Sequence, residues 1–430
     1  MNFDSIDNTV LDHRVKGMPG GVAPFRQGDI GRNDWNVLRE DMTLPLAVLK
    51  DSAITHNSHW MRDFLMRSHS VISPHGKTSM APQLFGRQIE DGAWAITVAT
   101  PQQIQVARDF GFSRIVLANQ LVGRQGVRYV LEELQRDPAL DFYCLVDSEA
   151  GVAMLAAAAR VANVGRPLQV LLEGGAQGGR TGVRDRETGM RIARAVKAAA
   201  PYLALRGVEG FEGLLAGASR AETEALVRGF LDLLVDLARD CEREDLYAPG
   251  EVILTAGGSA FYDMVLARFT HAGLRRPTRV VTRSGCYLSH DSSRYRRSFA
   301  DIVDRTPDAA AGGGLVPALE VWAYVQSRPE PTKVLLTLGA RDTATGDDKP
   351  VAQTWYRQGM AAPLPIEPGH VVTGMNDQHT HMAVPADSPL AFGDMVSFGV
   401  SHPCLTFDKW QVIVVVDDAY NVVSAIRTFF

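Results

Sequence analysis

Short apolar runs alternate with amphipathic segments from about residue 69 to residue 285. The amphipathic segments combine good helix formers with apolar residues three and four positions apart, which predicts helices. The clearest of these helices cover residues 101–110, 148–162, 187–199 and 220–239. Each apolar run between them predicts a buried strand, and the strands cover residues 70–74, 94–99, 114–119, 142–147, 168–173, 207–211, 252–256 and 280–283.

This repeated order of strand and helix predicts a parallel sheet, because a parallel crossover needs a helix or a long connection. Eight such units favour a closed (β/α)8 barrel, and an open doubly wound sheet is the alternative. We assign residues 46–285 to this barrel. Residues 1–45 form a segment that we expect to pack on one of the domains.

The pattern changes after Gly285, where glycine and proline become frequent and the apolar positions alternate with a period of two, as in Leu319, Val321, Ala323 and Val325. Such alternation is typical of strands with one buried face. We therefore predict an antiparallel β-rich domain over residues 286–430. Its further strands cover residues 332–338, 370–374, 395–400, 412–416 and 422–428.

Composition limits the class of protein and its partners. The chain has 430 residues, of which 46% are hydrophobic and 22% charged, as expected for a globular enzyme of two domains. A net charge of -5 argues against nucleic acid as a partner, and no apolar run is long enough to cross a membrane. We expect a cytoplasmic protein. Its four cysteines are too few and too widely spaced for a disulfide scaffold, so we expect reduced thiols.

Lys77 follows the first predicted strand directly. Barrel enzymes keep their chemistry at the carboxyl ends of the strands, which is where Lys77 and its neighbour His75 fall. A lysine in a partly dry pocket loses its proton easily and can form an imine with a carbonyl compound. The alternative is an ordinary surface lysine in a loop.

A glycine pair follows the seventh predicted strand, with Gly257 and Gly258 placed before Ser259 and a helix-like segment. Backbone N–H groups in such a turn converge on an anion, and barrels often bind phosphate after strands seven and eight. A plain glycine turn with Ser259 as the helix cap is the alternative. Together with the amine of Lys77, a phosphate site favours pyridoxal 5'-phosphate (PLP) as the cofactor.

A metal site is suggested by His402 and Cys404, which share one face if they lie on a strand. A thiolate and an imidazole favour Zn²⁺ over harder cations, although a half-buried strand with an incidental cysteine gives the same pattern. Two acidic pairs, Glu209 with Glu212 and Asp347 with Asp348, are interpreted as solvated surface.

The motifs at residues 74–78, 173–182, 255–259 and 284–287 resemble, in this order, those of the fold-type III PLP enzymes of the D-serine dehydratase and D-threonine aldolase family. The likeness covers the chain from about residue 45 to its end, because residues 377–379, 393–394 and 402–406 resemble that family's second domain. Two departures stand out. Leu214 replaces a histidine of many members, and Ser79-Met80 replaces a common His-Lys, so the chain looks most like the cryptic D-serine dehydratase branch.

The resemblance also implies roles for individual residues. It implies that Lys77 forms the covalent link with PLP, that Arg180 lies near the ring oxygen of PLP, and that Tyr287 lines the pocket. It further implies that His379 lies near the substrate. It assigns phosphate binding to Gly257, Gly258 and Ser259, and metal binding to His402 and Cys404.

The activity implied by the resemblance is that of a PLP- and Zn²⁺-dependent D-serine dehydratase. It releases pyruvate and ammonia from a D-β-hydroxy amino acid. The nearest alternative is a D-threonine aldolase, which yields glycine and an aldehyde. A racemase or a non-catalytic PLP carrier fits the predicted metal site and the long second domain less well. By analogy with related enzymes we expect a homodimer in which the second domain completes the pocket of the partner.

Overall fold

The computed structural model describes every residue except residue 347, and it divides into two compact units. We call them the barrel unit and the sheet unit. The barrel unit contains Arg62–Lys77 and Gln88–Gly285, and the sheet unit contains Met1–Met61, Thr78–Arg87 and Cys286–Phe430.

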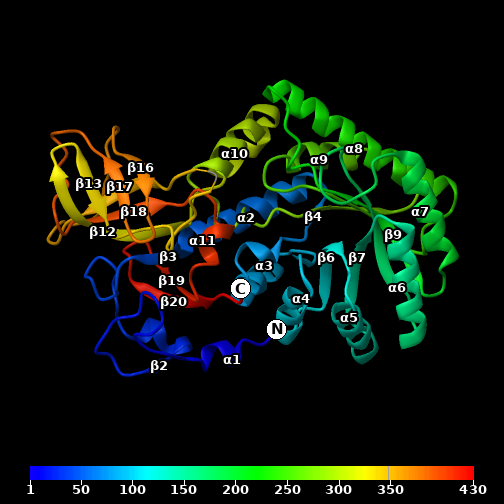
Figure 1. Cartoon of the computed structure of the whole chain (residues 1–430), viewed down its shortest axis with the longest axis horizontal. Helices are drawn as coiled ribbons and strands as arrows, with labels where there is room; N and C mark the ends of the chain where they lie inside the picture. The colour runs from blue at the N-terminus through cyan, green and yellow to red at the C-terminus, as the bar shows by residue number, and fades with distance from the viewer. Residues whose placement is uncertain (347) are drawn as a thin grey trace. The chain divides into compact units, whose positions relative to one another are not determined.

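All eight strands predicted for the first part of the chain are present, and every pair among them is parallel. Their order in the sheet is β4-β11-β10-β9-β8-β7-β6-β5. The sheet curves within the barrel unit (Figure 1). The bounds are β4 (Val71–Ile72), β5 (Ile96–Val98), β6 (Arg114–Gln120), β7 (Asp141–Val146), β8 (Leu168–Gly174), β9 (Leu203–Gly210), β10 (Val252–Thr255) and β11 (Thr278–Thr282).

Hydrogen bonds also join the two edge strands, β4 and β5. The Trp94 N–H donates to the Ile72 carbonyl at 2.8 Å, and the Thr97 N–H donates to the Pro74 carbonyl at 2.9 Å. A β-bridge between His75 and Thr97 continues this pairing. The sheet therefore closes on itself, which confirms the predicted barrel over the open sheet.

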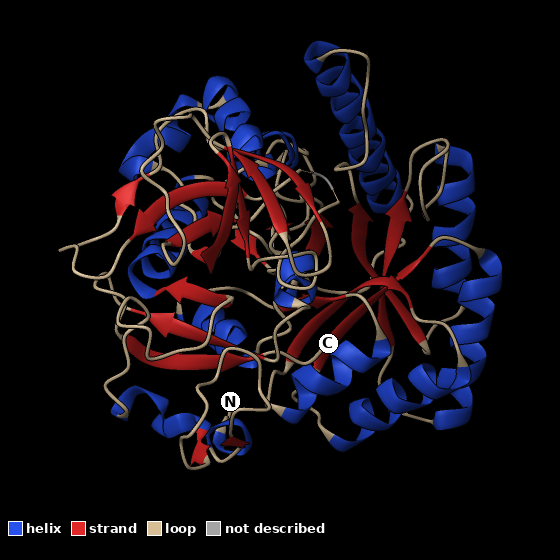
Figure 2. Cartoon of the chain, turned by 60° about the vertical axis from the view of Figure 1, so that its left-hand side comes forward, coloured by secondary structure: helices blue, strands red, loops and turns tan. Residues whose placement is uncertain are grey.

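Helices cover the outer face of this sheet (Figure 2). Side-chain caps explain why four helix starts were readable in the sequence. For example, the Thr100 hydroxyl accepts from the Gln103 N–H at 3.3 Å, and the Asp185 carboxylate accepts from the Thr188 N–H at 2.7 Å. The helices are α4 (Pro101–Asp109), α5 (Arg124–Arg136), α6 (Glu149–Ala162), α7 (Arg186–Ala198), α8 (Arg220–Arg243) and α9 (Tyr262–Phe269), while α2 (Asp51–Arg67) and α3 (Pro82–Glu90) contribute residues to both units.

The sheet unit is built on ten strands that pair antiparallel, apart from the parallel pair of β3 and β19. This confirms the predicted antiparallel domain. Its strands are β3 (Leu46–Lys50), β12 (Leu319–Glu330), β13 (Lys333–Leu336), β14 (Val351–Tyr356), β15 (Leu364–Pro365), β16 (Val371–Met375), β17 (Thr380–Ala383), β18 (Met395–Gly399), β19 (Val412–Val416) and β20 (Val422–Arg427). Its further elements are α1 (Asp4–Asp7), β1 (Val10–Leu11), β2 (Phe25–Arg26), η1 (Gln27–Arg32), α10 (Arg294–Arg305), η3 (Pro307–Gly313) and α11 (Cys404–Phe407).

The division of the chain differs from the predicted one near residue 46. Strand β3 falls in the segment assigned to the barrel, yet it lies between β12 and β19 of the sheet unit. Four consecutive apolar residues, Leu46 to Leu49, are fully buried there, as a central strand requires. The segment before it packs in the same unit, where Leu11, Ile30 and Val37 join the core around Trp322. No described helix is long and apolar enough to cross a membrane.

Candidate active site

Lys77 lies after the barrel strand β4, in the 3-10 turn η2 (Gly76–Thr78). The strand ends against β11, where the Ser73 N–H donates to the Thr282 carbonyl at 2.8 Å. Beyond this point the chain leaves the sheet, and the Lys77 side chain is exposed. An exposed primary amine after a barrel strand is able to meet a carbonyl ligand that arrives from solvent.

His75 stands two residues before this amine and carries no charge at neutral pH. Burial holds the pKa of His75 well below its ordinary value, and the positive charge of Lys77 adds to this effect. Its Nδ1 atom is buried and has no hydrogen-bond partner among the described residues. A buried, unpartnered nitrogen at this place marks a position where a ligand could bind.

The loop after β8 surrounds Glu173, whose side chain is buried. Its carboxylate accepts a hydrogen bond from the Thr181 hydroxyl at 2.7 Å and another from the Gln120 amide. Burial raises the pKa of Glu173. The Arg184 guanidinium fixes the loop by donating to the carbonyls of Thr181 and Gly182, both at 2.8 Å.

Arg180 belongs to the same loop and is exposed. Its guanidinium carbon lies 4.7 Å from the centroid of the Phe211 ring, a distance typical of a cation–π contact. The stacking holds Arg180 near the loops that follow β8 and β9. Leu214, at the position where the resemblance expects a histidine, is 58% exposed and so provides no buried ring contact.

Glu209 and Glu212 are buried in the barrel unit, at 2% and 0% exposure, so their assignment to solvated surface is wrong. Glu209 lies within β9, and Glu212 follows it in the next loop. The Arg283 guanidinium, itself 4% exposed, pairs with the Glu209 carboxylate and donates to the Thr255 hydroxyl at 2.9 Å. Burial outweighs this cation and raises the pKa of Glu209 to about 8.

The glycine loop after β10 is held by Glu212. The N–H groups of Gly257 and Gly258 donate to the two Glu212 carboxylate oxygens, at 2.9 and 3.0 Å. Gly257 has a φ of +93°, a conformation that favours glycine. The Ser259 hydroxyl lies 3.0 Å from the Ser284 hydroxyl. The backbone donors predicted for a phosphate therefore already bind a carboxylate.

The barrel unit has features that fit PLP. Among the described residues, buried side-chain atoms without a hydrogen-bond partner include Nδ1 of His75, one carboxylate oxygen of Glu209 and the hydroxyl of Thr282. A Cβ added to Gly257 would lie 2.7 Å from that Thr282 hydroxyl. These unpartnered groups come from or directly follow β4, β9 and β11, in the unit that contains the amine and the glycine loop. This arrangement fits a polar ligand.

The sheet unit contains both predicted metal ligands. His402 follows β18 in a loop and Cys404 begins the short helix α11, so the expected common strand is absent, as Pro403 between them explains. Their side chains nevertheless share a hydrogen bond. Hydrogen bonds from the Cys286 thiol and then from His402 lower the pKa of Cys404.

Further contacts surround the Cys404 sulfur. It lies 3.5 Å from the Cys286 sulfur and 3.5 Å from the Thr78 hydroxyl, and the Tyr295 ring contacts the His402 ring edge-on. The described residues hold no group of three or more His, Cys, Asp and Glu side chains arranged for a metal. His402 and Cys404 supply a nitrogen and a sulfur donor, two of the three protein ligands that catalytic zinc sites commonly have.

The other predicted site residues of the sheet unit occupy different environments. Tyr287 is buried at 3% exposure, whereas His379 is exposed in the turn between β16 and β17. Asp347 lies outside the described residues. Its partner in the predicted acidic pair, Asp348, makes an ion pair with Arg297 at 2.6 Å.

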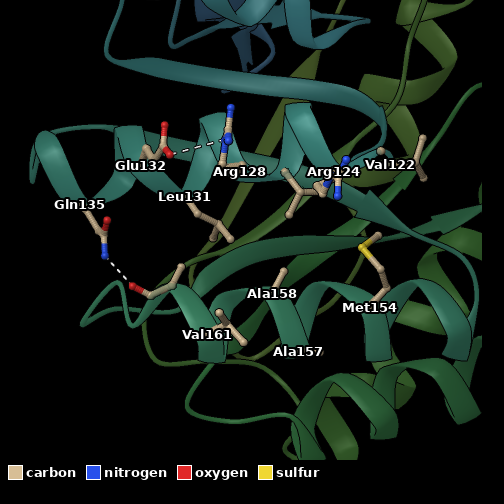
Figure 3. Close-up of a pocket in the computed structure, with 13 residues that line it drawn as sticks. Val122, Arg124, Arg128, Leu131, Glu132, Gln135, Met154, Ala157, Ala158 and Val161 are labelled. Atoms are coloured by element: carbon tan, nitrogen blue, oxygen red, sulfur yellow. Dashed lines mark hydrogen bonds and ion pairs between the residues drawn. The ribbon is translucent and has the colours of Figure 1, made fainter.

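Two cavities differ in whether residues of the candidate site line them. A cavity of about 500 Å³ lies at the carboxyl ends of β5, β6 and β7, and Gln120 and Thr181 line it. A larger cavity of about 880 Å³ lies between α5 and α6, and Figure 3 shows Leu131, Met154 and Val161 in its lining beside polar side chains such as Arg128. The larger cavity has none of the predicted site residues in its lining, so its size does not identify an active site.

Sequence reasoning missed five polar residues of these clusters, namely Gln120, Glu209, Glu212, Arg283 and Thr78. Three of them had a usable signal, because Gln120 ends β6, Glu209 lies near the end of β9 and Arg283 directly follows β11. Polar residues at the carboxyl ends of barrel strands are candidates for function. Thr78 gave no separate signal, since its contacts with two cysteines join residues far apart in the sequence.

The chain is similar to several known proteins. Residues 318–416 match the family model described as a putative serine dehydratase domain. A D-threonine aldolase of Arthrobacter sp. is 24% identical over 378 residues, which cover 87% of this chain and 89% of the aldolase.

Solved structures share the fold. The crystal structure of D-threonine aldolase from Filomicrobium marinum has a TM-score of 0.72 at 20% identity, covering 90% of this chain and 95% of that one. D-threo-3-hydroxyaspartate dehydratase from Delftia sp. HT23 has a TM-score of 0.70 at 19% identity, covering 90% and 97%. The same dehydratase is also similar in the metal-free form of a cysteine variant. These likenesses confirm the predicted architecture and the family resemblance.

Proposed function

We propose that the chain is a fold-type III enzyme that depends on PLP and that it is a lyase for D-β-hydroxy amino acids. This proposal rests on the polar groups that the barrel unit gathers at one end of its strands. There an exposed amine, a glycine loop and several unpartnered buried polar atoms follow the carboxyl ends of barrel strands. The relatives that cover most of the chain are named as an aldolase and a dehydratase, which are both lyases.

We assign PLP to Lys77, with Arg180 near the ring oxygen and Tyr287 as a wall of the pocket. When bound, PLP supplies an aldehyde for the substrate amine and an electron sink that makes the Cα–H bond acidic. Gly257, Gly258 and Ser259 are assigned to the phosphate. Because Glu212 already accepts from both glycine N–H groups, we expect the glycines to shape the loop and Ser259 to supply a donor.

The residues of the chain then have distinct tasks. With PLP bound, Lys77 would be the general base that removes the Cα proton of the substrate. His75 is neutral, so it adds no positive charge beside the Lys77 amine. His379 is assigned a position near the bound substrate.

His402 and Cys404 are assigned to a divalent metal, for which a sulfur and an imidazole ligand favour Zn²⁺. A metal held there supplies Lewis-acid stabilisation to the β-hydroxyl group of the substrate. The Thr78 hydroxyl lies 3.5 Å from the Cys404 sulfur and is a further polar neighbour of this assigned metal site.

Within this class we propose a D-serine dehydratase that yields pyruvate and ammonia. The match of residues 318–416 to a putative serine dehydratase domain and the thiolate ligand favour it. A D-threonine aldolase is the second candidate, because the Arthrobacter relative covers most of the chain. We also propose a homodimer, in which the exposed His379 is available to the pocket of the partner.

Product analysis separates the two candidates. With D-threonine, a dehydratase forms 2-oxobutyrate and ammonia, whereas an aldolase forms glycine and acetaldehyde. With a deuterium label at Cα, elimination must break the labelled bond, but aldol cleavage need not. Glycine and aldehyde with the label retained contradict the dehydratase assignment, while no turnover of any D-β-hydroxy amino acid contradicts the lyase.

A further inference from the structure

Two of the four cysteines form a close pair. The Sγ atoms of Cys286 and Cys404 lie 3.5 Å apart, although 118 positions separate these residues in the sequence. Both are free thiols in this structure. A disulfide has an S–S distance of about 2.0 Å, so the sulfurs need to approach by only about 1.5 Å to bond.

The surroundings distinguish the two thiols from each other. Cys286 is buried at 4% exposure, whereas Cys404 is partly exposed at the start of α11. The Thr78 hydroxyl contacts both sulfurs, at 3.9 Å from Cys286 and 3.5 Å from Cys404. A reagent from solvent therefore meets Cys404 first, and Cys286 stands behind it.

The two remaining cysteines lack this arrangement. Cys144 and Cys241 are buried in the barrel unit, and the Cys241 sulfur contacts the Met190 sulfur at 3.9 Å. Among the described residues, neither has the close cysteine sulfur that Cys286 and Cys404 offer each other. They serve as internal controls for any thiol chemistry of the protein.

We propose that Cys286 and Cys404 form a reversible oxidation site that reacts with low-molecular-mass disulfides such as glutathione disulfide. The Cys404 thiolate attacks one sulfur of the reagent, forms a mixed disulfide and releases one glutathione. Cys286 then gives up its proton and attacks the Cys404 sulfur, which releases the second glutathione. The two protein thiols are oxidised to one disulfide, and one glutathione disulfide is reduced to two thiols.

This site has a consequence for the metal that rests on the proposed function. Cys404 is one of only two assigned metal ligands, and a sulfur in a disulfide is no longer a thiolate ligand. Oxidation and metal binding therefore exclude each other at Cys404. Zinc protects the pair from oxidation, and the disulfide prevents zinc from binding.

Peptide mapping tests the site directly. We expect the full-length protein, freed of metal and treated with glutathione disulfide, to show one linkage between the Cys286 and Cys404 peptides that dithiothreitol reverses. Cys144 and Cys241 should remain free thiols. A stable glutathione adduct on Cys404 without the linkage, or equal modification of Cys144 and Cys241, contradicts the proposal.

The variant Cys286→Ser is the matched control, since it keeps a small polar side chain and removes only the second thiol. It should take up zinc as the wild type does and retain glutathione on Cys404. If glutathione does not stay on Cys404 in this variant, Cys286 is not the thiol that resolves the mixed disulfide, and the proposal fails. Thermal unfolding of the variant checks that it is folded.

Zinc loading separates this proposal from the proposed function. We expect saturating zinc to slow formation of the disulfide by about tenfold or more, because the thiolate is occupied. If the disulfide forms equally fast with and without zinc, the oxidation site stands and the metal assignment of Cys404 fails. If no disulfide forms in either state, the oxidation site fails and the metal assignment stands.

Discussion

Single residues at the carboxyl ends of the barrel strands decide the charge of the candidate site. Glu209 is buried beside Arg283 and keeps one carboxylate oxygen unpartnered, whereas Glu212 has both oxygens bound by backbone N–H groups. Removal of a carboxylate from water disfavours its charge, and good hydrogen bonds restore it. Burial therefore raises the pKa of Glu209, whereas the Glu212 carboxylate holds the glycine loop.

The raised pKa of Glu209 gives the stability of the protein a defined pH dependence. With a pKa of about 8 in the folded state against 4.5 ordinarily, the contribution of Glu209 is fully present below 4.5 and is lost by about pH 8. We expect the wild type to lose stability relative to Glu209→Gln from pH 5 to 8, by at most about 1.4 kcal/mol per pH unit. Urea unfolding of both proteins measures this difference, and parallel curves would show that Glu209 is ionised throughout.

The sequence revealed some of these residues and concealed others. Lys77 and Ser259 lie within a few residues of apolar runs, so their places could be predicted from the strands, whereas Arg180 was named only through the family resemblance. Glu209 and Glu212 were misplaced because a carboxylate is usually solvated, and only the burial of Arg283 beside Glu209 shows otherwise. The Thr78 and Cys286 contacts with Cys404 depend on tertiary structure that no local pattern encodes.

At the scale of elements, apolar runs and capping residues predicted the strands and helices whose formation depends on the local sequence. The buried barrel strands are apolar runs, and Thr100, Ser148, Asp185 and Ser219 cap the helices that follow. Strand β3 was assigned to the barrel because an apolar run does not reveal which sheet it joins. The helix α11 replaced an expected strand because Pro403 lacks the N–H group that a ladder needs.

The glycine loop after β10 is the element on which cofactor binding should depend most. In Gly257→Ala the new Cβ would lie 2.7 Å from the Thr282 hydroxyl, at a φ of +93°. Strain of about 1–3 kcal/mol is typical of such positions, so we expect PLP affinity to fall about tenfold or more. Titration of the apoprotein with PLP, followed by its absorbance, measures the effect.

Gly92→Ala provides the matched control for this variant. Gly92 has a similar φ of +102°, but a Cβ there meets nothing within 4 Å and the residue lies in a turn after α3. It should lower the thermal stability through backbone strain and leave PLP affinity unchanged. Equal loss of PLP affinity in both variants would assign the effect to general destabilisation.

At the scale of the whole molecule, the two units supply different parts of the proposed chemistry. The barrel unit contains Lys77 and the glycine loop, and the sheet unit contains His402 and Cys404. The chain passes from one unit to the other four times, and two of these crossings lie between Lys77 and Thr78 and between Gly285 and Cys286. Cofactor attachment and metal binding should therefore be separable by experiment.

Removal of the metal should stop turnover without releasing PLP. We expect chelation, or Cys404→Ala, to lower the rate with D-serine by about 100-fold or more, because several kcal/mol of charge stabilisation are lost. The absorbance of PLP bound to Lys77 should persist. Zinc should restore the chelated wild type but not the variant, and unchanged activity after complete metal removal would contradict a catalytic metal.

The central claim is that this chain is a PLP enzyme whose cofactor is bound by Lys77. Reduction of the PLP-loaded protein with borohydride, followed by digestion and mass spectrometry, tests it most directly. We predict a single pyridoxyl group on the peptide that contains Lys77, none on this peptide in Lys77→Ala, and no turnover by that variant even when PLP binds without a covalent link. A pyridoxyl group on another lysine, or none at all in the wild type, would contradict the claim.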